Sequence, residues 1–442
     1  MQDRIALIAD NSNEYVQYLL KIWENNDVAV LIDWRIPYDT IESILNETNI
    51  AYCYADKHHF IQLREYHNNV EEIISHSNKA MILDKSLYNY KENYSQQDAV
   101  IFFSSGTTGK SKGIILSHFA INTNADHIIE YMSLKDDDVI YITKTLAHSS
   151  TFVGELLVGL KSNIQVIISP TIIPLSHTLN NINRYKVTIL CLNPTLLYLY
   201  SKWLEKNLFE FETLHTIYVS GSILKDNILS NALQCFNNIS IFNMYGLTEC
   251  GPRVTVQNKK SINKFGSVGS AIQDTYIRVL DFNGKLVPNK SIGIVYVKTL
   301  TIMKGYINTP EKQSLKDGYW CTGDLGYIDD EGDLFIVGRK DNMIISSSHN
   351  IYPEEIEYII NADKEIVDNI IFGVDDELYG QKIICLYTSS KDKNKDLLKL
   401  CQQSLATYEI PHEFIKVKNL PRTFNGKISR VASKIIYKNL RK

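Results

Sequence analysis

The sequence predicts an α/β fold with parallel sheets, followed by a β-rich segment and a small C-terminal domain. Three observations lead to this prediction. Up to about residue 252, short apolar runs alternate with segments of helical period, as in sheets built from βαβ units. Residues 253–339 then carry short strand-like runs broken by Gly and Pro, a texture typical of a meander or barrel. Residues 340–442 return to an alternation of their own, which indicates a separate domain.

The expected αβ elements follow in chain order. RIALIA (4–9) and VAVLID (28–33) have the length and apolar character of buried strands, and NEYVQYLLKIWENN (13–26) between them has a helical period. After residue 50, further strand candidates are AMILD (80–84), IQVIIS (164–169), VTILCL (187–192) and TIYVSGS (216–222). PTLLYLYSKWLEKN (194–207) is the helix expected between the last two of them.

The β-rich segment and the tail have their own expected elements. Strand candidates in the segment are YIRVLDFNGKLVP (276–288), GIVYVK (293–298) and DLFIVG (333–338). The tail is expected to contain EEIEYIINA (354–362) as a helix, NIIFGV (369–374) and KIICLYTS (382–389) as strands, and a helix near 394–407.

Composition excludes several classes of protein. The 442 residues allow two or three domains, since single cores stop growing near ~250–300 residues. A net charge of −4 gives no general reason to expect nucleic-acid binding. The first residues lack the apolar core of a signal peptide, and no run approaches the ~20 apolar residues of a membrane span. Seven cysteines without a C-x-x-C pair argue against zinc and disulfides, so a reduced, cytoplasmic protein is expected.

The most informative motif is SSGTTGKSKG (104–113), which lies between two apolar runs. Glycines let the backbone approach a ligand closely, hydroxyls and N–H groups bind phosphate oxygens, and lysines neutralise their charge. A P-loop is the competing interpretation, but it requires glycine where Ser104 stands and a helix where Gly113-Ile114-Ile115-Leu116 resembles a strand. A Gly/Ser-rich surface loop is the other alternative.

Two further motifs suggest nucleotide contacts. NMYGLTECGP (243–252) can present Tyr245 as a stacking surface, Thr248 as a phosphate donor and Glu249 as a Mg²⁺ ligand, although an ordinary turn would have similar residues. Asp324 follows a Thr-Gly turn, and a carboxylate there can accept two ribose hydroxyls. Arg339 can add a bidentate contact.

Two other charged segments have simpler alternatives. The acidic run 329–333 between Asp324 and Arg339 is expected to be a hairpin tip rather than a metal site, because acidic residues with glycine are typical turn chemistry. LPRTFNGKISR (420–430) places Lys427 after a glycine turn, where an unremarkable surface lysine is also possible.

Together, in this order, the four motifs resemble those of the adenylate-forming superfamily of acyl-CoA synthetases, luciferases and peptide-synthetase adenylation domains. The resemblance covers essentially the whole chain. It implies an N-terminal core over residues 1–339, with two αβ subdomains in about 1–252 and a distorted β-barrel in about 253–339. It also implies a mobile C-terminal domain over residues 340–442.

The resemblance further implies a role for each matching residue. ATP and Mg²⁺ are the expected cofactors, and the β- and γ-phosphates would be held by Ser104, Ser105, Gly106, Thr107, Thr108, Gly109, Lys110 and Lys112. For the nucleotide, Tyr245 beside Gly246 would stack on adenine, Thr248 would contact the α-phosphate, Glu249 would bind Mg²⁺, and Asp324 with Arg339 would contact the ribose. Lys427 would bridge the carboxylate and the α-phosphate, and Lys340 or Asp341 would act as the hinge. His148 would gate the acyl pocket. A buried core histidine remains the alternative for His148.

This inventory fits the chemistry that the family carries out. Attack of a carboxylate on the α-phosphorus of ATP expels pyrophosphate and gives an acyl-adenylate, and two anions must meet in this step. Mg²⁺ on Glu249, the Lys427 ammonium and the loop donors would offset the charge that develops. Attack by a thiol follows, which requires the C-terminal domain to rotate.

Three departures from the family pattern matter. The chain begins where relatives are already some tens of residues in, and Ser111 stands where family loops usually have proline. Ser347 and Ser348 replace glycines that line the thiol route, which puts efficient transfer to CoA in question.

Three functions are therefore considered. The first is an acyl-CoA synthetase, and the second is an enzyme that passes the acyl group to the phosphopantetheine of a carrier protein acting in trans, or to an amine. The third is a non-catalytic relative, which would be expected to lack some of the four charged residues that this chain retains: Glu249, Asp324, Arg339 and Lys427.

The sequence restricts the substrate only in part. Amino-acid-activating relatives carry an aspartate near the position of Ser149 and Ser150, and none is present here, so a non-amino carboxylic acid is expected. Family positions suggest a pocket for an apolar acyl group of modest size, lined by His148, Phe152, Gly221, Ser222 and Met244.

Overall fold

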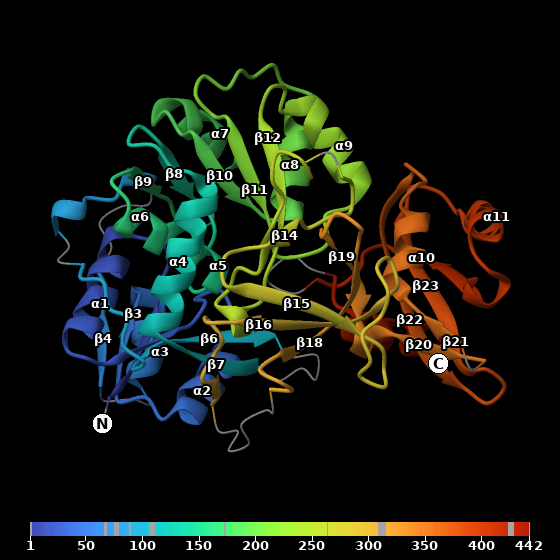
Figure 1. The fold of residues 1–442 in the computed structure, drawn as a ribbon, viewed down its shortest axis with the longest axis horizontal. Coiled ribbons are helices and arrows are strands. Elements are labelled where there is room, and N and C mark those ends of the chain that lie inside the picture. The colour runs from blue at the N-terminus through green and yellow to red at the C-terminus, as the bar shows by residue number, and fades with distance from the viewer. Residues whose placement is uncertain are drawn as a thin grey trace.

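The computed structural model describes residues 2–65, 69–74, 79–87, 90–105, 111–171, 174–262, 264–307, 315–347, 349–422 and 428–441. Two large sheets and a smaller antiparallel sheet form the main lobe, and a C-terminal domain, drawn in orange and red, lies to one side of it (Figure 1). In the described ranges, no helix has the length and apolar character that crossing a membrane requires.

The first sheet has seven strands in the order β17-β7-β6-β2-β1-β3-β4. Its strands from β6 to β4 pair in parallel, and β7 and β17 add an antiparallel edge. The strands are β1 (Arg4–Ile8), β2 (Val28–Leu31), β3 (Tyr52–Ala55), β4 (Val70–Glu72), β6 (Asp98–Ser105), β7 (Ser111–Ser117) and β17 (Gly305–Tyr306). The associated helices are α1 (Asn13–Glu24), α2 (Tyr38–Thr48) and α3 (Lys57–Arg64). The strand β7 after the phosphate motif, where a P-loop needs a helix, confirms that the P-loop interpretation does not apply.

The second sheet has eight strands in the order β14-β13-β12-β11-β10-β8-β9-β5, and the central five are parallel. The strands are β5 (Met81–Ile82), β8 (Val139–Ile142), β9 (Gln165–Ile168), β10 (Ile189–Leu192), β11 (Thr216–Val219), β12 (Ser240–Tyr245), β13 (Thr255–Val256) and β14 (Ser270–Ala271). The helices are α4 (His118–Met132), α5 (Ser149–Thr151), α6 (Val158–Lys161), α7 (Leu175–Arg184), α8 (Pro194–Leu204) and α9 (Asp226–Cys235), and a π-helical turn, η2 (Phe152–Leu157), joins α5 to α6. The predicted alternation of strands and helices is thus confirmed.

Residues 253–339 are rich in β-strands, as expected. They contribute one open four-stranded antiparallel sheet in the order β15-β16-β18-β19, formed by Thr275–Leu280, Gly293–Thr299, Trp320–Ile328 and Leu334–Arg339. The short strands β13 and β14 extend the second large sheet instead, and β17 extends the first. The β texture was therefore predicted correctly, while the partners of the shortest strands depend on tertiary pairing that a local pattern does not contain.

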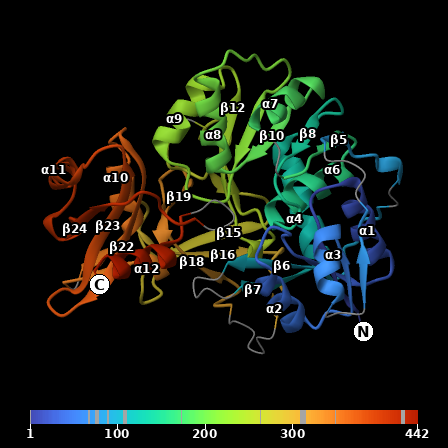
Figure 2. The ribbon, with the colours of Figure 1, turned by 180° about the vertical axis from the view of Figure 1, so that it is seen from behind.

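The C-terminal domain is built around a three-stranded sheet in the order β22-β23-β24. Its elements are β20 (Ile344–Ser346), β21 (His349–Ile351), α10 (Pro353–Ile360), β22 (Ile366–Asp376), β23 (Gly380–Ser389), α11 (Asn394–Ser404), β24 (Glu413–Lys416) and α12 (Arg430–Leu440). The last helix packs against β22 on the face seen from behind in Figure 2.

The largest hydrophobic core joins the two large sheets through α4 and η2. Phe152 lies at its centre, with ring centroids 5.4 Å from Phe102 and 5.9 Å from Trp23. Some of the helices begin at a capping side chain. The Ser12 hydroxyl accepts a hydrogen bond from the Tyr15 N–H at the start of α1.

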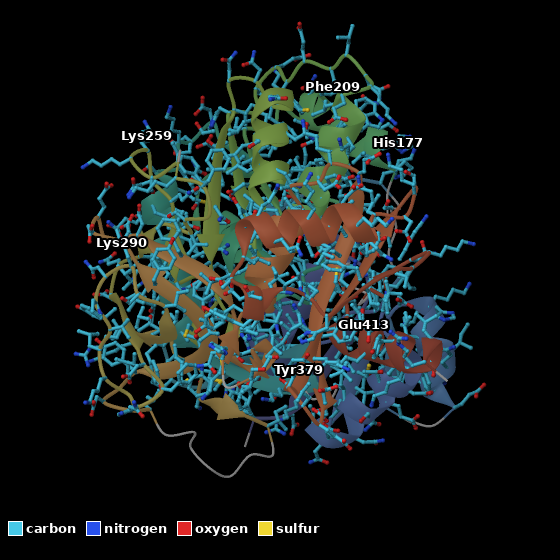
Figure 3. All side chains as sticks on the ribbon, turned by 90° about the vertical axis from the view of Figure 1, so that its right-hand side faces the viewer. His177, Phe209, Lys259, Lys290, Tyr379 and Glu413 are labelled. Carbon is cyan, nitrogen blue, oxygen red and sulfur yellow. The ribbon has the colours of Figure 1, made fainter. Side chains whose placement is uncertain are left out.

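The C-terminal domain touches the main lobe through α10. The Tyr358 hydroxyl donates to Asp226 Oδ2 at 2.7 Å, and a Cβ on Gly338 of β19 would lie 2.4 Å from Glu354 Oε2. Figure 3 views the molecule from the side of this domain, and Tyr379 and Glu413 lie on the part that faces the viewer. The structure therefore holds the domain against α9 and the end of β19.

Candidate active site

The hairpin β18–β19 brings Asp324 and Arg339 together. The two residues are direct cross-strand partners, and Arg339 Nη1 lies 2.8 Å from Asp324 Oδ1. The second carboxylate oxygen accepts a 2.5 Å hydrogen bond from the hydroxyl of Tyr245, which ends β12. Asp324 is only 6% exposed, and its two carboxylate oxygens are held by one side chain from the hairpin and one from the second sheet. Residues of two predicted motifs thus meet at one place.

This geometry also shows a contact that the motifs did not indicate. Tyr245 was expected to stack on adenine, but its hydroxyl is bound to Asp324. Burial, together with the charge of Asp324, raises the pKa of Tyr245 well above its ordinary value, so the phenol remains a donor. Each carboxylate oxygen can accept more than one hydrogen bond, and Asp324 therefore keeps acceptor capacity for the hydroxyls of a ribose.

Thr248 and Glu249 lie in the 3₁₀ turn η3 (Thr248–Cys250), directly after β12. The Thr248 hydroxyl lies 2.7 Å from the Ser149 hydroxyl at the start of α5. Glu249 Oε1 accepts a 2.9 Å hydrogen bond from the Tyr306 hydroxyl on β17. Because β17 pairs with β7, this contact connects Glu249 to the strand pair β6–β7, which flanks the phosphate motif.

Two of these partners, Ser149 and Tyr306, were not assigned contacts from the sequence. Tyr306 follows a glycine in a short strand whose pairing is tertiary, so no local signal could have found it. Burial and the charge of Glu249 raise the pKa of Tyr306, which keeps it protonated as a donor. The Lys112 ammonium lies 5.2 Å from the centroid of the Tyr306 ring, which brings one cation of the phosphate motif to the same place.

The residues present fit a Mg²⁺ ion that is shared with phosphate. In the part of the chain that the structure describes, no group of three or more His, Cys, Asp or Glu side chains could hold a metal. Mg²⁺ is commonly held by one or two carboxylates together with substrate phosphates and water. Glu249, whose oxygen is already fixed by Tyr306, could supply such a carboxylate.

Part of the predicted phosphate loop lies in strands. Ser104 and Ser105 end β6 and pair with Lys112 and Ser111 on β7, so the connection is shorter than the expected loop. Several predicted site residues lie outside the described residues: Gly106, Thr107, Thr108, Gly109, Lys110 and Lys427. Their roles, and those of the Ser104 and Ser105 side chains, stay predictions.

The predicted acyl-pocket residues divide into two groups. His148 is exposed at the start of α5, so the alternative of a buried core histidine is wrong. Gly221 and Ser222 are also exposed, just beyond β11. Phe152, by contrast, is fully buried between core aromatics, which corrects its assignment as an accessible pocket wall. Met244 is 3% exposed, and its sulfur accepts a hydrogen bond of 3.4 Å from the Tyr131 hydroxyl.

Two smaller predictions can be compared with the backbone. A Cβ on Gly246 would lie 1.8 Å from the Pro252 carbonyl oxygen, so glycine is required here by close packing. Lys340 and Asp341 are exposed in the short turn η4 (Lys340–Asn342) between β19 and β20. The acidic run 329–333 forms the hairpin tip, where the Lys264 ammonium pairs with Asp329, Glu331 and Asp333.

Comparison with known proteins agrees with this site. Residues 1–307 match the family model of the AMP-binding enzymes, and residues 355–427 match the model of the AMP-binding enzyme C-terminal domain. An indoleacetate–CoA ligase from Aromatoleum aromaticum is 29% identical over 344 residues, which cover 76% of this chain and 66% of that protein. A 2-succinylbenzoate–CoA ligase from Bacillus mycoides is 25% identical over 97% of this chain and 87% of its own length.

Solved structures share the fold at lower identity. ATP-bound MatB from Rhodopseudomonas palustris superposes with a TM-score of 0.88 at 23% identity, covering 100% of this chain and 90% of that one. The O-succinylbenzoate coenzyme A synthetase MenE from Bacillus subtilis, in complex with ATP and magnesium, gives 0.83 at 24% identity and covers 98% and 89%. By its domain matches and its motifs, this chain belongs to the AMP-binding enzyme family of the adenylate-forming superfamily.

Proposed function

We propose that the protein is an AMP-forming acyl-CoA synthetase. It would use ATP and Mg²⁺ to activate a small or medium non-amino carboxylic acid as an acyl-adenylate, release pyrophosphate, and transfer the acyl group to a thiol. The observation that supports this proposal most is the meeting of Asp324, Arg339 and Tyr245 one turn from Thr248 and Glu249. The relatives named as CoA ligases favour CoA as the acceptor.

In the first step, the described residues would bind and orient the nucleotide. Asp324 would accept the ribose hydroxyls, and Arg339 and Tyr245 would hold its carboxylate in place. The Thr248 hydroxyl, positioned by Ser149, would donate to the α-phosphate. A Mg²⁺ ion on Glu249 would neutralise phosphate charge as pyrophosphate leaves. Lys427 is proposed to bridge the two reacting anions.

In the second step, the C-terminal domain would rotate about Lys340 and Asp341, which divide an adenylation core (1–339) from a mobile domain (340–442). The position of these residues in an exposed turn between two strands supports this division. The protein is proposed to act in the cytoplasm.

One observation favours a second candidate function, the loading of a carrier protein or an amine in trans. Ser347 has a φ of 49°, a left-handed backbone conformation that favours glycine, and its N–H donates to the Tyr379 carbonyl. A serine thus occupies a backbone conformation suited to the family's glycine, and its side chain would narrow the thiol route. Changing Ser347 and Ser348 to glycine should speed thiol transfer more than adenylation, and equal effects on both steps would contradict this reading.

The first experiment measures pyrophosphate release from ATP and Mg²⁺ with a panel of carboxylic acids. Hydroxylamine traps any acyl-adenylate, and each acid that reacts is repeated with CoA. Acyl-CoA formation would support the synthetase, whereas hydroxamate without acyl-CoA would favour a carrier protein or amine acceptor. No release with any acid would refute both. A matched control is Asp330→Asn, since Asp330 lies on the hairpin tip and pairs with Lys290 at the surface.

A further inference from the structure

A cluster of buried charges lies beside the predicted acyl pocket. Arg253 is 2% exposed and is the largest of the fully buried side chains, and Glu155 is 0% exposed. Lys144 Nζ lies 2.9 Å from Glu155 Oε1. Lys144, Glu155 and Arg253 are called the buried charge cluster below.

The cluster lies against predicted site residues on three sides. A Cβ on Gly246 would lie 3.1 Å from the Arg253 Cα, so the side chain starts next to the nucleotide motif. A Cβ on Gly154 would lie 2.6 Å from Arg253 Nη2, which places the guanidinium against the turn η2. The Tyr131 phenol, which donates to the Met244 sulfur, is also a hydrogen-bond partner of Arg253. The Arg253 main chain therefore lies beside Gly246, and its guanidinium lies beside Gly154 in the turn that begins with Phe152.

The cluster carries more positive than negative charge. Two cations, Lys144 and Arg253, face one carboxylate, and that carboxylate is paired with Lys144. Across the described ranges, Arg253 Nε, the buried hydroxyl of Thr151 and both carboxylate oxygens of Glu155 have no hydrogen-bond partner, so Glu155 is held by its ion pair with Lys144 alone. A buried arginine without a complete set of acceptors is costly, because it has lost the hydration that water would supply.

A purely structural role accounts for the Arg253 main chain but not for its guanidinium. The Asn124 side chain donates to the Arg253 carbonyl and accepts from its N–H, both at 3.1 Å. These contacts would be the same for any residue. Gly154, moreover, leaves room for the guanidinium that an alanine would take away. The buried guanidinium of Arg253 thus has an N–H donor, at Nε, that lacks an acceptor among the described residues.

We infer that Arg253 receives the far end of the carboxylic acid, and that the acid carries a second carboxylate there. The inference rests on the proposed function, because it extends the acyl site that begins at Thr248 and Ser149. A carboxylate would supply the missing negative charge and could accept two parallel N–H bonds from the guanidinium. The expected apolar walls would then enclose the middle of a dicarboxylic acid rather than its end.

The test compares acids of equal length with and without the second carboxylate: succinate with butyrate, adipate with hexanoate, and terephthalate with 4-methylbenzoate. The monomethyl ester of each dicarboxylic acid serves as a neutral acceptor. Pyrophosphate release gives kcat/KM for each acid with wild type, Arg253→Met and Arg253→Lys. We expect at least one dicarboxylic acid to be preferred over its partner by about 100-fold or more. In Arg253→Met this ratio should fall to near one, and Arg253→Lys should restore part of it.

Three outcomes would overturn the inference: a preference of the wild type for monocarboxylic acids, an equal preference for the ester, or an unchanged ratio in Arg253→Met. If Arg253→Met does not fold, Glu155→Gln provides a second test. Removing this negative charge should lower the KM for the dicarboxylic acid, and a higher KM would contradict the inference. If no acid of any kind reacts, the proposed function fails. Thermal stabilisation of the wild type by a dicarboxylic acid with ATP, lost in Arg253→Met and kept in part in Arg253→Lys, would still support Arg253 as a carboxylate site. No stabilisation of the wild type would refute it.

Discussion

The two ends of the hairpin β18–β19 both carry acidic residues, but the carboxylates at the two ends have different partners. At the tip, Asp329, Glu331 and Asp333 share the Lys264 ammonium, at 2.9, 2.7 and 2.7 Å. At the other end, Asp324 is fixed by Arg339 and by a tyrosine from another sheet. Each end takes one partner from a distant segment, Lys264 at the tip and Tyr245 at the other end, but only the Asp324 end borders the nucleotide motif. Acidic residues and distant partners therefore do not identify a site by themselves; the neighbouring residues do.

The largest effect should come from a charge that acts on the reacting atoms. Lys427→Ala should lower the rate of adenylation by about 10²–10⁴-fold and leave ATP binding nearly intact, because the lysine is expected to offset charge only as the two anions meet. Pyrophosphate release and ATP binding of the variant are measured in parallel. Adenylation at the wild-type rate would remove the assigned role.

A matched pair of variants tests the two ends of the hairpin directly. Asp324→Asn should lower kcat/KM for ATP by about 10–100-fold, since a charged acceptor for the ribose and a partner of Arg339 are lost. Asp329→Asn makes the same chemical change at the tip and should leave kcat/KM within about twofold. Similar losses in the two variants would show that the ends do not differ in function.

The smallest effect concerns stability at low pH. Although burial raises it, hydrogen bonds from Lys264 and from the N–H groups of Asp333 and Glu331 hold the pKa of Asp329 below its ordinary value. A depressed folded pKa contributes stability above the unfolded value of about 3.9, which is lost as pH falls through the folded value. Wild type should therefore melt above Asp329→Asn at pH 7, and the gap should close below about pH 4. A gap that is constant down to pH 3 would contradict the assignment.

The sequence predicted this hairpin well because its information is local. A turn at 329–333 sets the register near the tip, and a one-residue shift between Leu325 and Gly326 then makes Asp324 and Arg339 partners. The contacts of Glu249 with Tyr306 and of Thr248 with Ser149 could not be predicted, since each joins elements that meet only in the tertiary fold. Phe152 shows the same limit, because a buried aromatic in a helical segment fits a pocket wall and a core equally well until its neighbours are known. The short strands β13, β14 and β17 were not predicted, because their pairing is tertiary.

The hydrogen bond from Tyr245 to Asp324 also bears on how the enzyme distinguishes sugars. Enzymes that rely on a buried acceptor to recognise a hydroxyl reject analogues without it by ~10⁴–10⁵-fold, because the acceptor is left unpaired. Here Arg339 and Tyr245 keep both oxygens of Asp324 paired whatever nucleotide is bound. The protein should therefore accept 2′-deoxy-ATP with a loss in kcat/KM that is far smaller than this range. Removing the phenol in Tyr245→Phe should make the discrimination between the two sugars stricter.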